Sequence, residues 1–216
     1  MLTPCQVIDL GCGPGRSLLP LYRLGFHCTG IDLSEHMLDE ARKLLVPLSP
    51  RGRGVRGEGE TLAKDSTPQP KLLQANLGDP LPLESHTFDA AVCLFGTLGM
   101  LHPKTVRAHF LSEVKRLLKP EGIFLVHVHN RWPLQGISTL FKRNSVVTLP
   151  VHQGISNLQM KLYTEREIRN TLQASGLRVH DLEYLDASHP QGEYTSTRWL
   201  APYRAAGFLL AASPQS

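Results

Sequence analysis

The sequence predicts an α/β fold, a doubly wound and mostly parallel sheet of seven strands with helices on both of its faces. Short, almost continuously apolar segments alternate with segments whose apolar residues recur at helical spacing. Glycine and proline lie at most of the boundaries between these segments. The length of 216 residues, with 41% hydrophobic residues, suits a single domain with a sizeable core.

The first quarter of the chain contains two strand–helix units. Residues 6–10 predict a strand that leads through a glycine turn into a helix, which runs to about Leu24 and is closed by Gly25. Residues 28–32 predict the second strand, after which Ser34 caps a helix. The apolar face of that helix consists of Met37, Leu38, Ala41, Leu44 and Leu45.

Residues 47–71 interrupt this pattern. The segment is rich in glycine and proline and carries five basic and three acidic side chains, so it holds half of the net charge of +4. We predict a disordered insertion within one domain that spans residues 1–216. A tolerated surface insertion is the favoured interpretation, and an arginine–glycine arm that contacts RNA is the alternative.

Regular structure is expected to resume with strands at residues 72–75 and 90–94, both nearly continuous in apolar character, as in buried parallel strands. A helix at 104–118 follows, and residues 119–122 stop it. The next strand is expected at 123–129.

The remainder of the chain begins with a mixed segment, residues 130–160, a candidate cover for the substrate with a short helix near 134–142. Thr164 and Glu167 then form a capping box at the start of a helix that ends at Gly176. The last two strands are expected around 177–185 and 208–212.

Composition excludes several classes of protein. No apolar run approaches the roughly 20 residues that cross a bilayer, and the start lacks a secretory signal, so we expect a soluble, cytoplasmic protein. The pI of 9.0 permits contact with phosphates, but no dense basic block carries the charge. The four cysteines share no CxxC spacing, which favours buried thiols over a zinc site.

The most informative motif follows the first strand, where Asp9 lies two residues before a Gly-x-Gly-x-Gly turn formed by Gly11, Gly13 and Gly15. Glycine lets a ligand approach the backbone closely. A dinucleotide site would need a further glycine where Arg16 stands, and Asp9 would repel a pyrophosphate. The motif therefore favours a ligand that carries an ammonium and a sulfonium over NAD.

Four segments, in order, carry a resemblance to a known family. They are residues 7–15, the sequence TGIDLS at 29–34, residues 75–83 with the 87–89 lead-in to the fourth strand, and LLKPEG at 117–122. Through them the chain resembles the class I S-adenosylmethionine-dependent methyltransferases, from residue 7 to about 212. The resemblance implies a Rossmann-like fold and S-adenosylmethionine as the cofactor.

The same resemblance assigns the cofactor-binding residues. Asp9 would orient the amino group of the cofactor, Asp32 would clamp the ribose, and the Gly11–Gly13 backbone would lie against the ligand. Asn76 stands where the family often has aspartate, and its amide oxygen can accept from the adenine amino group. The full set is Asp9, Gly11, Cys12, Gly13, Asp32, Leu33, Met37, Asn76, Leu77 and Leu94, although Met37 is equally a core residue.

Candidate catalytic residues lie after the fourth and fifth strands, because ligands bind beyond the carboxyl ends of open α/β sheets. His129 or His102 would take a proton from the acceptor, and Asn130 would orient it. Structural histidines are the competing interpretation. His127 and His129 share a face of the strand, but no third metal ligand is evident, so we expect no metal.

The acceptor is expected to be a small molecule, because residues 94–97 lack the Asn/Asp-Pro-Pro-aromatic motif of base amino methyltransferases. The alternatives are an RNA or tRNA methyltransferase of the same fold and a non-catalytic domain that binds S-adenosylmethionine. Only five residues precede the first strand, where the family usually has one or two helices. Either the start is truncated or the site is unusually open, and the acceptor atom and the oligomeric state stay open.

Overall fold

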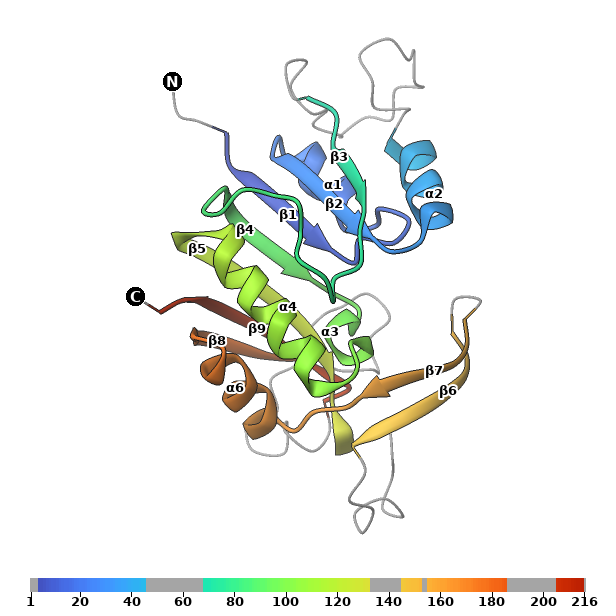
Figure 1. The fold of residues 1–216 in the computed structure, drawn as a ribbon, viewed down its shortest axis with the longest axis vertical. Helices are drawn as coiled ribbons and strands as arrows, with labels where there is room; N and C mark the ends of the chain where they lie inside the picture. Colours follow the sequence, from blue (N-terminus) through green and yellow to red (C-terminus); the bar gives the residue numbers. More distant parts are fainter. Residues whose placement is uncertain (1–3, 46–67, 133–144, 153–154, 186–204, 216) are drawn as a thin grey trace.

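The computed structural model describes residues 4–45, 68–132, 145–152, 155–185 and 205–215. A seven-stranded sheet with the order β3-β2-β1-β4-β5-β9-β8 forms its centre (Figure 1). The first five of these strands run parallel, and β9 is antiparallel to both β5 and β8. This confirms the predicted fold class.

The strands of the sheet are β1 (Gln6–Leu10), β2 (His27–Asp32), β3 (Lys71–Gln74), β4 (Phe88–Cys93), β5 (Leu118–His129), β8 (Leu177–Leu185) and β9 (Gly207–Pro214). The helices are α1 (Leu18–Arg23), α2 (Glu35–Leu45), α3 (Thr97–Met100), α4 (Lys104–Leu117) and α6 (Glu165–Ala174). A separate antiparallel hairpin contains β6 (Val146–His152) and β7 (Ile155–Lys161). None of the helices in the described ranges is long and apolar enough to span a membrane.

Helices cover both faces of the sheet because each contributes one apolar stripe. In Figure 1, α4 and α6 lie in front of the sheet, and their side chains join the larger hydrophobic core. Side chains of α1 and α2 form a second core with Cys12 and Cys28. In α2, Leu38, Ala41 and Leu45 are buried, as the helical spacing predicts.

The residues that the sequence predicts at the ends of α1 and α6 and at the start of α6 adopt the expected conformations. Gly25 and Gly176 adopt positive φ angles of 87° and 73° after α1 and α6. The predicted capping box is present: the Thr164 hydroxyl accepts from the Glu167 backbone N–H, and the Glu167 carboxylate accepts from that of Thr164.

Two predicted strand boundaries in the central part of the chain were wrong. Strand β5 begins at Leu118 rather than at 123, because Leu118 already pairs with Phe88 of β4 and the irregular register before Ala90 absorbs the predicted turn. Strand β3 begins at Lys71, inside the expected insertion, because Lys71 pairs with Thr29. Two elements were not predicted: the β6–β7 hairpin, which begins within the mixed segment 130–160, and helix α3.

Two other predictions concern residues outside the described part of the chain. They are the remainder of the 47–71 insertion, up to residue 67, and the short helix near 134–142.

Candidate functional site

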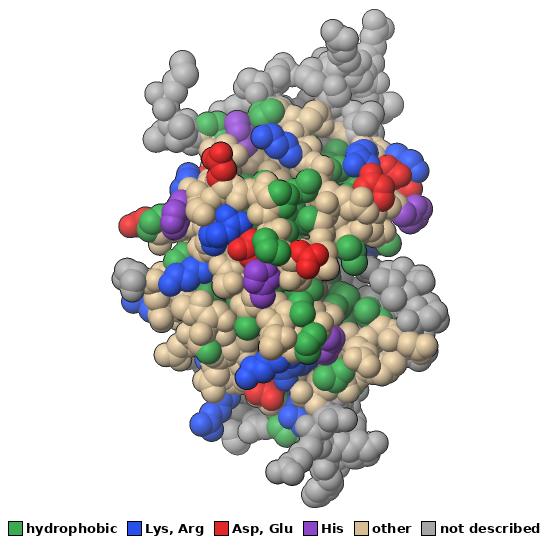
Figure 2. Space-filling view, in the orientation of Figure 1, with side chains coloured by type: hydrophobic (Ala, Val, Ile, Leu, Met, Phe, Trp, Pro, Cys, Tyr) green, Lys and Arg blue, Asp and Glu red, His purple; other side chains and the backbone are tan. Residues whose placement is uncertain are grey.

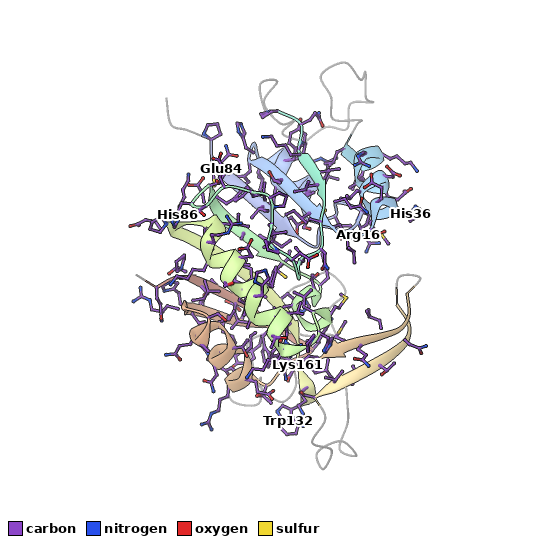
Figure 3. All side chains as sticks on the ribbon, viewed as in Figure 1. Arg16, His36, Glu84, His86, Trp132 and Lys161 are labelled. Atoms are coloured by element: carbon purple, nitrogen blue, oxygen red, sulfur yellow. The ribbon has the colours of Figure 1, made fainter. Side chains whose placement is uncertain are left out.

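The predicted site residues gather at the edge where the parallel strands β1, β2, β4 and β5 end. Figure 3 shows Arg16, from the turn after β1, and Trp132, beyond β5, on the side to which these strands point. Glu84 and His86, which precede β4, lie on the opposite side. Parallel topology brings the carboxyl ends together, so residues far apart in sequence share one edge.

The glycine turn after β1 is fixed to the end of β2. The backbone N–H groups of Gly11 and Cys12 donate to the Ile31 carbonyl at 2.8 and 2.9 Å. Gly11 has a φ of 85°, and a Cβ there would lie 2.6 Å from the Thr97 side chain, so only glycine fits. A Cβ on Gly13 would meet nothing within 4 Å, which leaves its backbone open to a ligand.

Asp32 ties this turn to the start of α2. One carboxylate oxygen accepts from the Gly13 N–H at 2.8 Å, and the other accepts from the Ser34 N–H at 2.9 Å. Each oxygen keeps acceptor capacity beyond these bonds, because an ionised carboxylate offers about four lone-pair positions. The orientation of the carboxylate is therefore fixed before any ligand arrives.

Asp9 is 1% exposed, which is unusual for an aspartate. Its Oδ2 accepts a hydrogen bond from the Ser17 hydroxyl, whereas its Oδ1 is buried and has no partner in the described part of the chain. Burial raises the pKa of Asp9 from 3.8 to about 6, the Ser17 hydrogen bond opposes this rise, and the charge of Asp32 adds to it. A buried carboxylate with a free oxygen favours a cationic donor beside it.

These features fit S-adenosylmethionine. Its ammonium supplies donors for the unpartnered oxygen of Asp9, and its ribose hydroxyls supply donors for Asp32. The open space beside Gly13 allows the ligand to approach the backbone. A pyrophosphate would instead add negative charge between two carboxylates.

The remaining predicted cofactor residues differ in how much side chain they present. Leu33, which follows β2, is 65% exposed, and Phe95, which follows β4, is 56% exposed, so both offer apolar surface. Met37 and Leu94 are half-buried, and Cys12 is buried against Gly30.

Asn76 and Leu77 follow β3. Asn76 is exposed, and its side-chain oxygen accepts from the Gly78 N–H at 2.9 Å. This bond fixes the amide orientation and leaves one lone pair of that oxygen for a ligand. The Leu77 side chain belongs to the larger core, so only its backbone is available at the edge.

His129 is the last residue of β5. A Cβ on Gly96 would lie 2.6 Å from the His129 ring, so the ring lies directly against the turn that follows β4. The His127 ring contacts it edge-on, with centroids 4.9 Å apart. Burial and then His129 lower the pKa of His127 to about 4, so His127 is neutral at physiological pH.

Asn130 and His102 are more enclosed. The Asn130 side chain is fully buried, donates to the Ala205 carbonyl at 2.8 Å and accepts from the Trp132 N–H at 3.3 Å. His102 Nδ1 lies 3.4 Å from a guanidinium nitrogen of Arg107. Burial and the charge of Arg107 lower the pKa of His102, so its ring is neutral at physiological pH.

Comparison with known proteins identifies the family. The sequence profile of a family described as "Methyltransferase domain" matches residues 8–126, which is more than half of the chain. The chain belongs to the class I S-adenosylmethionine-dependent methyltransferases. The matched range includes the glycine turn, Asp32 and the segment after β4.

Relatives of this chain include the putative methyltransferase YqeM of Bacillus subtilis, 33% identical over 130 residues that make up 60% of this chain and 44% of YqeM. The uncharacterized protein MJ1252 of Methanocaldococcus jannaschii is 27% identical over 186 residues, 80% of this chain and 61% of that protein. The chain therefore spans about half the length of these relatives. A solved S-adenosylmethionine-dependent methyltransferase from Methanosarcina mazei has a TM-score of 0.72 at 18% identity, covering 100% and 94% of the two chains.

Sequence reasoning missed two residues of the site, Ser17 and Thr97. Ser17 contacts Asp9, and Thr97 packs against Gly11. A serine just before a helix signals a cap, so the sequence alone gave no reason to connect it with the carboxylate. Within the described ranges, no group of three His, Cys, Asp or Glu residues is arranged to hold a metal ion.

Proposed function

We propose that this methyltransferase transfers a methyl group from S-adenosylmethionine to a small-molecule acceptor. The observation that carries the proposal is the buried carboxylate of Asp9, whose Oδ1 has no partner in the described part of the chain. Asp9 lies near the end of β1, opposite Gly30 of β2, and the turn that follows contains Gly13, which leaves the backbone open and donates its N–H to Asp32. This combination suits a ligand with a cationic amino acid end and a ribose.

The cofactor, when bound, supplies a methyl group on a positively charged sulfur for an in-line displacement. The chain has to hold and align the two reactants, since alignment provides much of the rate of such a reaction. Asp9 and Asp32 would hold the cofactor by accepting hydrogen bonds from its amino group and its ribose hydroxyl groups. Leu33 and Phe95 present apolar surface at the same edge.

His129 is the residue that we propose as proton acceptor. Its ring lies against Gly96, directly after β4, where the acceptor and the methyl group are expected to meet. A neutral imidazole there takes the proton that a hydroxyl or amine loses as it is methylated. Asn130 and His102 are enclosed by backbone groups and Arg107, so we propose that they position the loops around His129.

The acceptor side favours a small molecule over RNA. Helix α3 packs on β7, where a Cβ on Gly99 would lie 2.6 Å from the Lys161 carbonyl, and the β6–β7 hairpin extends beyond β5 (Figure 1). Helix α3 and the β6–β7 hairpin therefore border the end of β5, where we propose that the acceptor binds. In Figure 2, Lys and Arg side chains are interspersed with Asp and Glu, and the described residues on the face shown form no continuous basic stripe.

Relatives act on both kinds of acceptor. They include a ubiquinone/menaquinone biosynthesis C-methyltransferase from Ruegeria, 30% identical over 149 residues, and an 18S rRNA (guanine-N(7))-methyltransferase from Bos taurus, 31% identical over 91 residues. RNA is therefore the second acceptor class to include in the test. Methylation of RNA should fall steeply with added salt, because phosphate contacts release counterions.

The test measures methyl transfer to a panel of small hydroxyl, amine and carbon acids and, separately, to total RNA. We expect turnover with a small molecule, and His129→Ala to lower kcat about 100-fold or more while S-adenosylhomocysteine affinity is kept. His180→Ala is the matched control, because His180 lies on β8 and its ring makes a hydrogen bond with Ser213 of β9. Turnover of RNA alone, or an unchanged kcat in His129→Ala, would contradict the proposal.

A further inference from the structure

Two serines precede the two helices that follow β1 and β2, and their hydroxyl groups are used differently. The Ser34 hydroxyl accepts a hydrogen bond from the Met37 N–H at 3.3 Å, which is the usual helix cap. The Ser17 hydroxyl makes no capping bond to α1 and donates instead to Oδ2 of Asp9. Ser17 thus occupies a capping position without capping.

This arrangement leaves the first turn of α1 without its usual stabilisation. The helix has six residues, no side-chain cap and no acidic residue in its first turn. A serine at this position normally stabilises a helix by satisfying a free backbone N–H. Where a residue gives up its favoured local role, the cause is commonly a functional contact.

The functional contact is with a carboxylate that has no positive neighbour among the described residues. Asp32 is the charged group that acts on Asp9. The nearby thiols of Cys12, Cys28 and Cys93 are neutral, since burial and then the charge of Asp9 raise their pKa values. Ser17 donates the hydrogen bond that favours the ionised form of Asp9.

The two oxygens of Asp9 are therefore not equivalent. Ser17 occupies Oδ2, and Oδ1 is buried with no partner among the described residues. A single hydroxyl donor thus keeps one oxygen engaged and leaves the other for the ligand. An ammonium has three donors and no acceptor, so it matches the free oxygen and would clash with a donor already placed there.

We infer that Ser17 is a positioning residue for cofactor binding, whose hydroxyl holds Oδ2 of Asp9 so that Oδ1 receives the ammonium of S-adenosylmethionine. The inference rests on the family's cofactor. A purely structural role of Ser17 would change the affinity for all ligands of the site equally. The positioning role affects only ligands that carry the ammonium.

The test is calorimetric titration of S-adenosylhomocysteine into the whole chain at a series of pH values around 6, where Asp9 titrates. Ser17→Ala is expected to bind about tenfold more weakly near neutral pH, and the midpoint of its pH dependence should move up by about one pH unit. The physical reason is the loss of a hydrogen bond to the ionised carboxylate. Ser17→Thr keeps a hydroxyl and should keep the original midpoint.

Two controls separate this effect from misfolding. 5′-Methylthioadenosine lacks the amino acid end, so Ser17→Ala should bind it as the unmodified chain does, which also reports on folding. Ser34→Ala removes a true helix cap and should lower the melting temperature without moving the pH midpoint.

The inference is overturned if the Ser17→Ala midpoint equals that of the unmodified chain, or if Ser17→Thr shifts the midpoint as far as Ser17→Ala does. An equal loss of affinity for S-adenosylhomocysteine and for 5′-methylthioadenosine in the Ser17→Ala variant would also overturn it. If the unmodified chain fails to bind S-adenosylhomocysteine, the cofactor assignment itself fails, and this outcome is distinct from the others.

Discussion

Asp32→Ala is expected to weaken S-adenosylhomocysteine binding about 100-fold or more. The substitution removes the acceptors proposed for the ribose hydroxyls, and each hydrogen bond to a charged group contributes about 1.5–3 kcal/mol. It also frees the N–H groups of Gly13 and Ser34, which the carboxylate now holds at 2.8 and 2.9 Å. The glycine turn therefore loses its attachment to α2, and the melting temperature should fall as well.

Calorimetry on the variant and on a matched control measures this effect. Asp39→Ala removes another aspartate of the same region, but Asp39 lies on the exposed face of α2 and pairs with Arg42 at 2.6 Å. The affinity of the Asp39→Ala variant for S-adenosylhomocysteine should equal that of the unmodified chain. Equal affinities for the Asp32→Ala variant and the unmodified chain would remove Asp32 from the site.

Asp9→Asn is expected to lower the affinity for S-adenosylhomocysteine by about 10- to 100-fold. At neutral pH the same substitution is expected to stabilise the fold. The unmodified chain should bind more weakly as the pH falls below about 6, because protonation removes the charge that attracts the ammonium. The affinity of the variant should lack this dependence. Asparagine keeps the size of the side chain, so packing in the core changes little.

The stabilisation follows from the sign of the pKa shift. Asp9 has a pKa of about 6 in the folded chain against 3.8 ordinarily, so the folded state binds this proton more tightly. The free energy of unfolding therefore falls as the pH rises from about 4 to about 6. Removing the buried charge should raise it at neutral pH by about 1–3 kcal/mol, measured by urea unfolding.

Asp89→Asn is the contrasting control. Asp89 lies on β4 and accepts hydrogen bonds from Lys119 at 2.7 Å and from the Gln6 N–H at 2.8 Å. Burial raises the pKa of Asp89, but the two hydrogen bonds favour the ionised form, so the pKa is lowered overall. Its removal should destabilise the fold above the ordinary aspartate pKa and leave ligand affinity unchanged. A destabilised Asp9→Asn variant with unchanged affinity would contradict the role proposed for Asp9.

The parts of the fold that local patterns determine could be predicted. Apolar strands, helical spacing in α2 and the Thr164–Glu167 capping box depend on neighbouring residues, so the sequence displays them directly. The early start of β5 depends on pairing with Phe88, and the small helix α3 depends on packing against Gly11 and β7. Long-range contacts of this kind leave little trace in a local pattern.

The candidate site likewise contains residues that the sequence predicts and contacts that it does not. Asp9, Gly13 and Asp32 belong to motifs with fixed spacing, and the structure brings them to one edge. The Asp9 oxygen without a partner among the described residues and the Ser17 hydroxyl that bonds Asp9 could not be predicted, because they depend on which atoms meet in the folded chain. The enclosure of Asn130 by the Ala205 carbonyl joins residues 75 positions apart and had no local signal.

Calorimetric titration of S-adenosylhomocysteine and NAD into the unmodified chain measures which of the two ligands the edge around Asp9 and Asp32 binds. We expect micromolar-range binding of S-adenosylhomocysteine and no binding of NAD, because Asp9 favours an ammonium and disfavours a pyrophosphate. Binding of NAD with comparable affinity, or no binding of S-adenosylhomocysteine, would contradict the account.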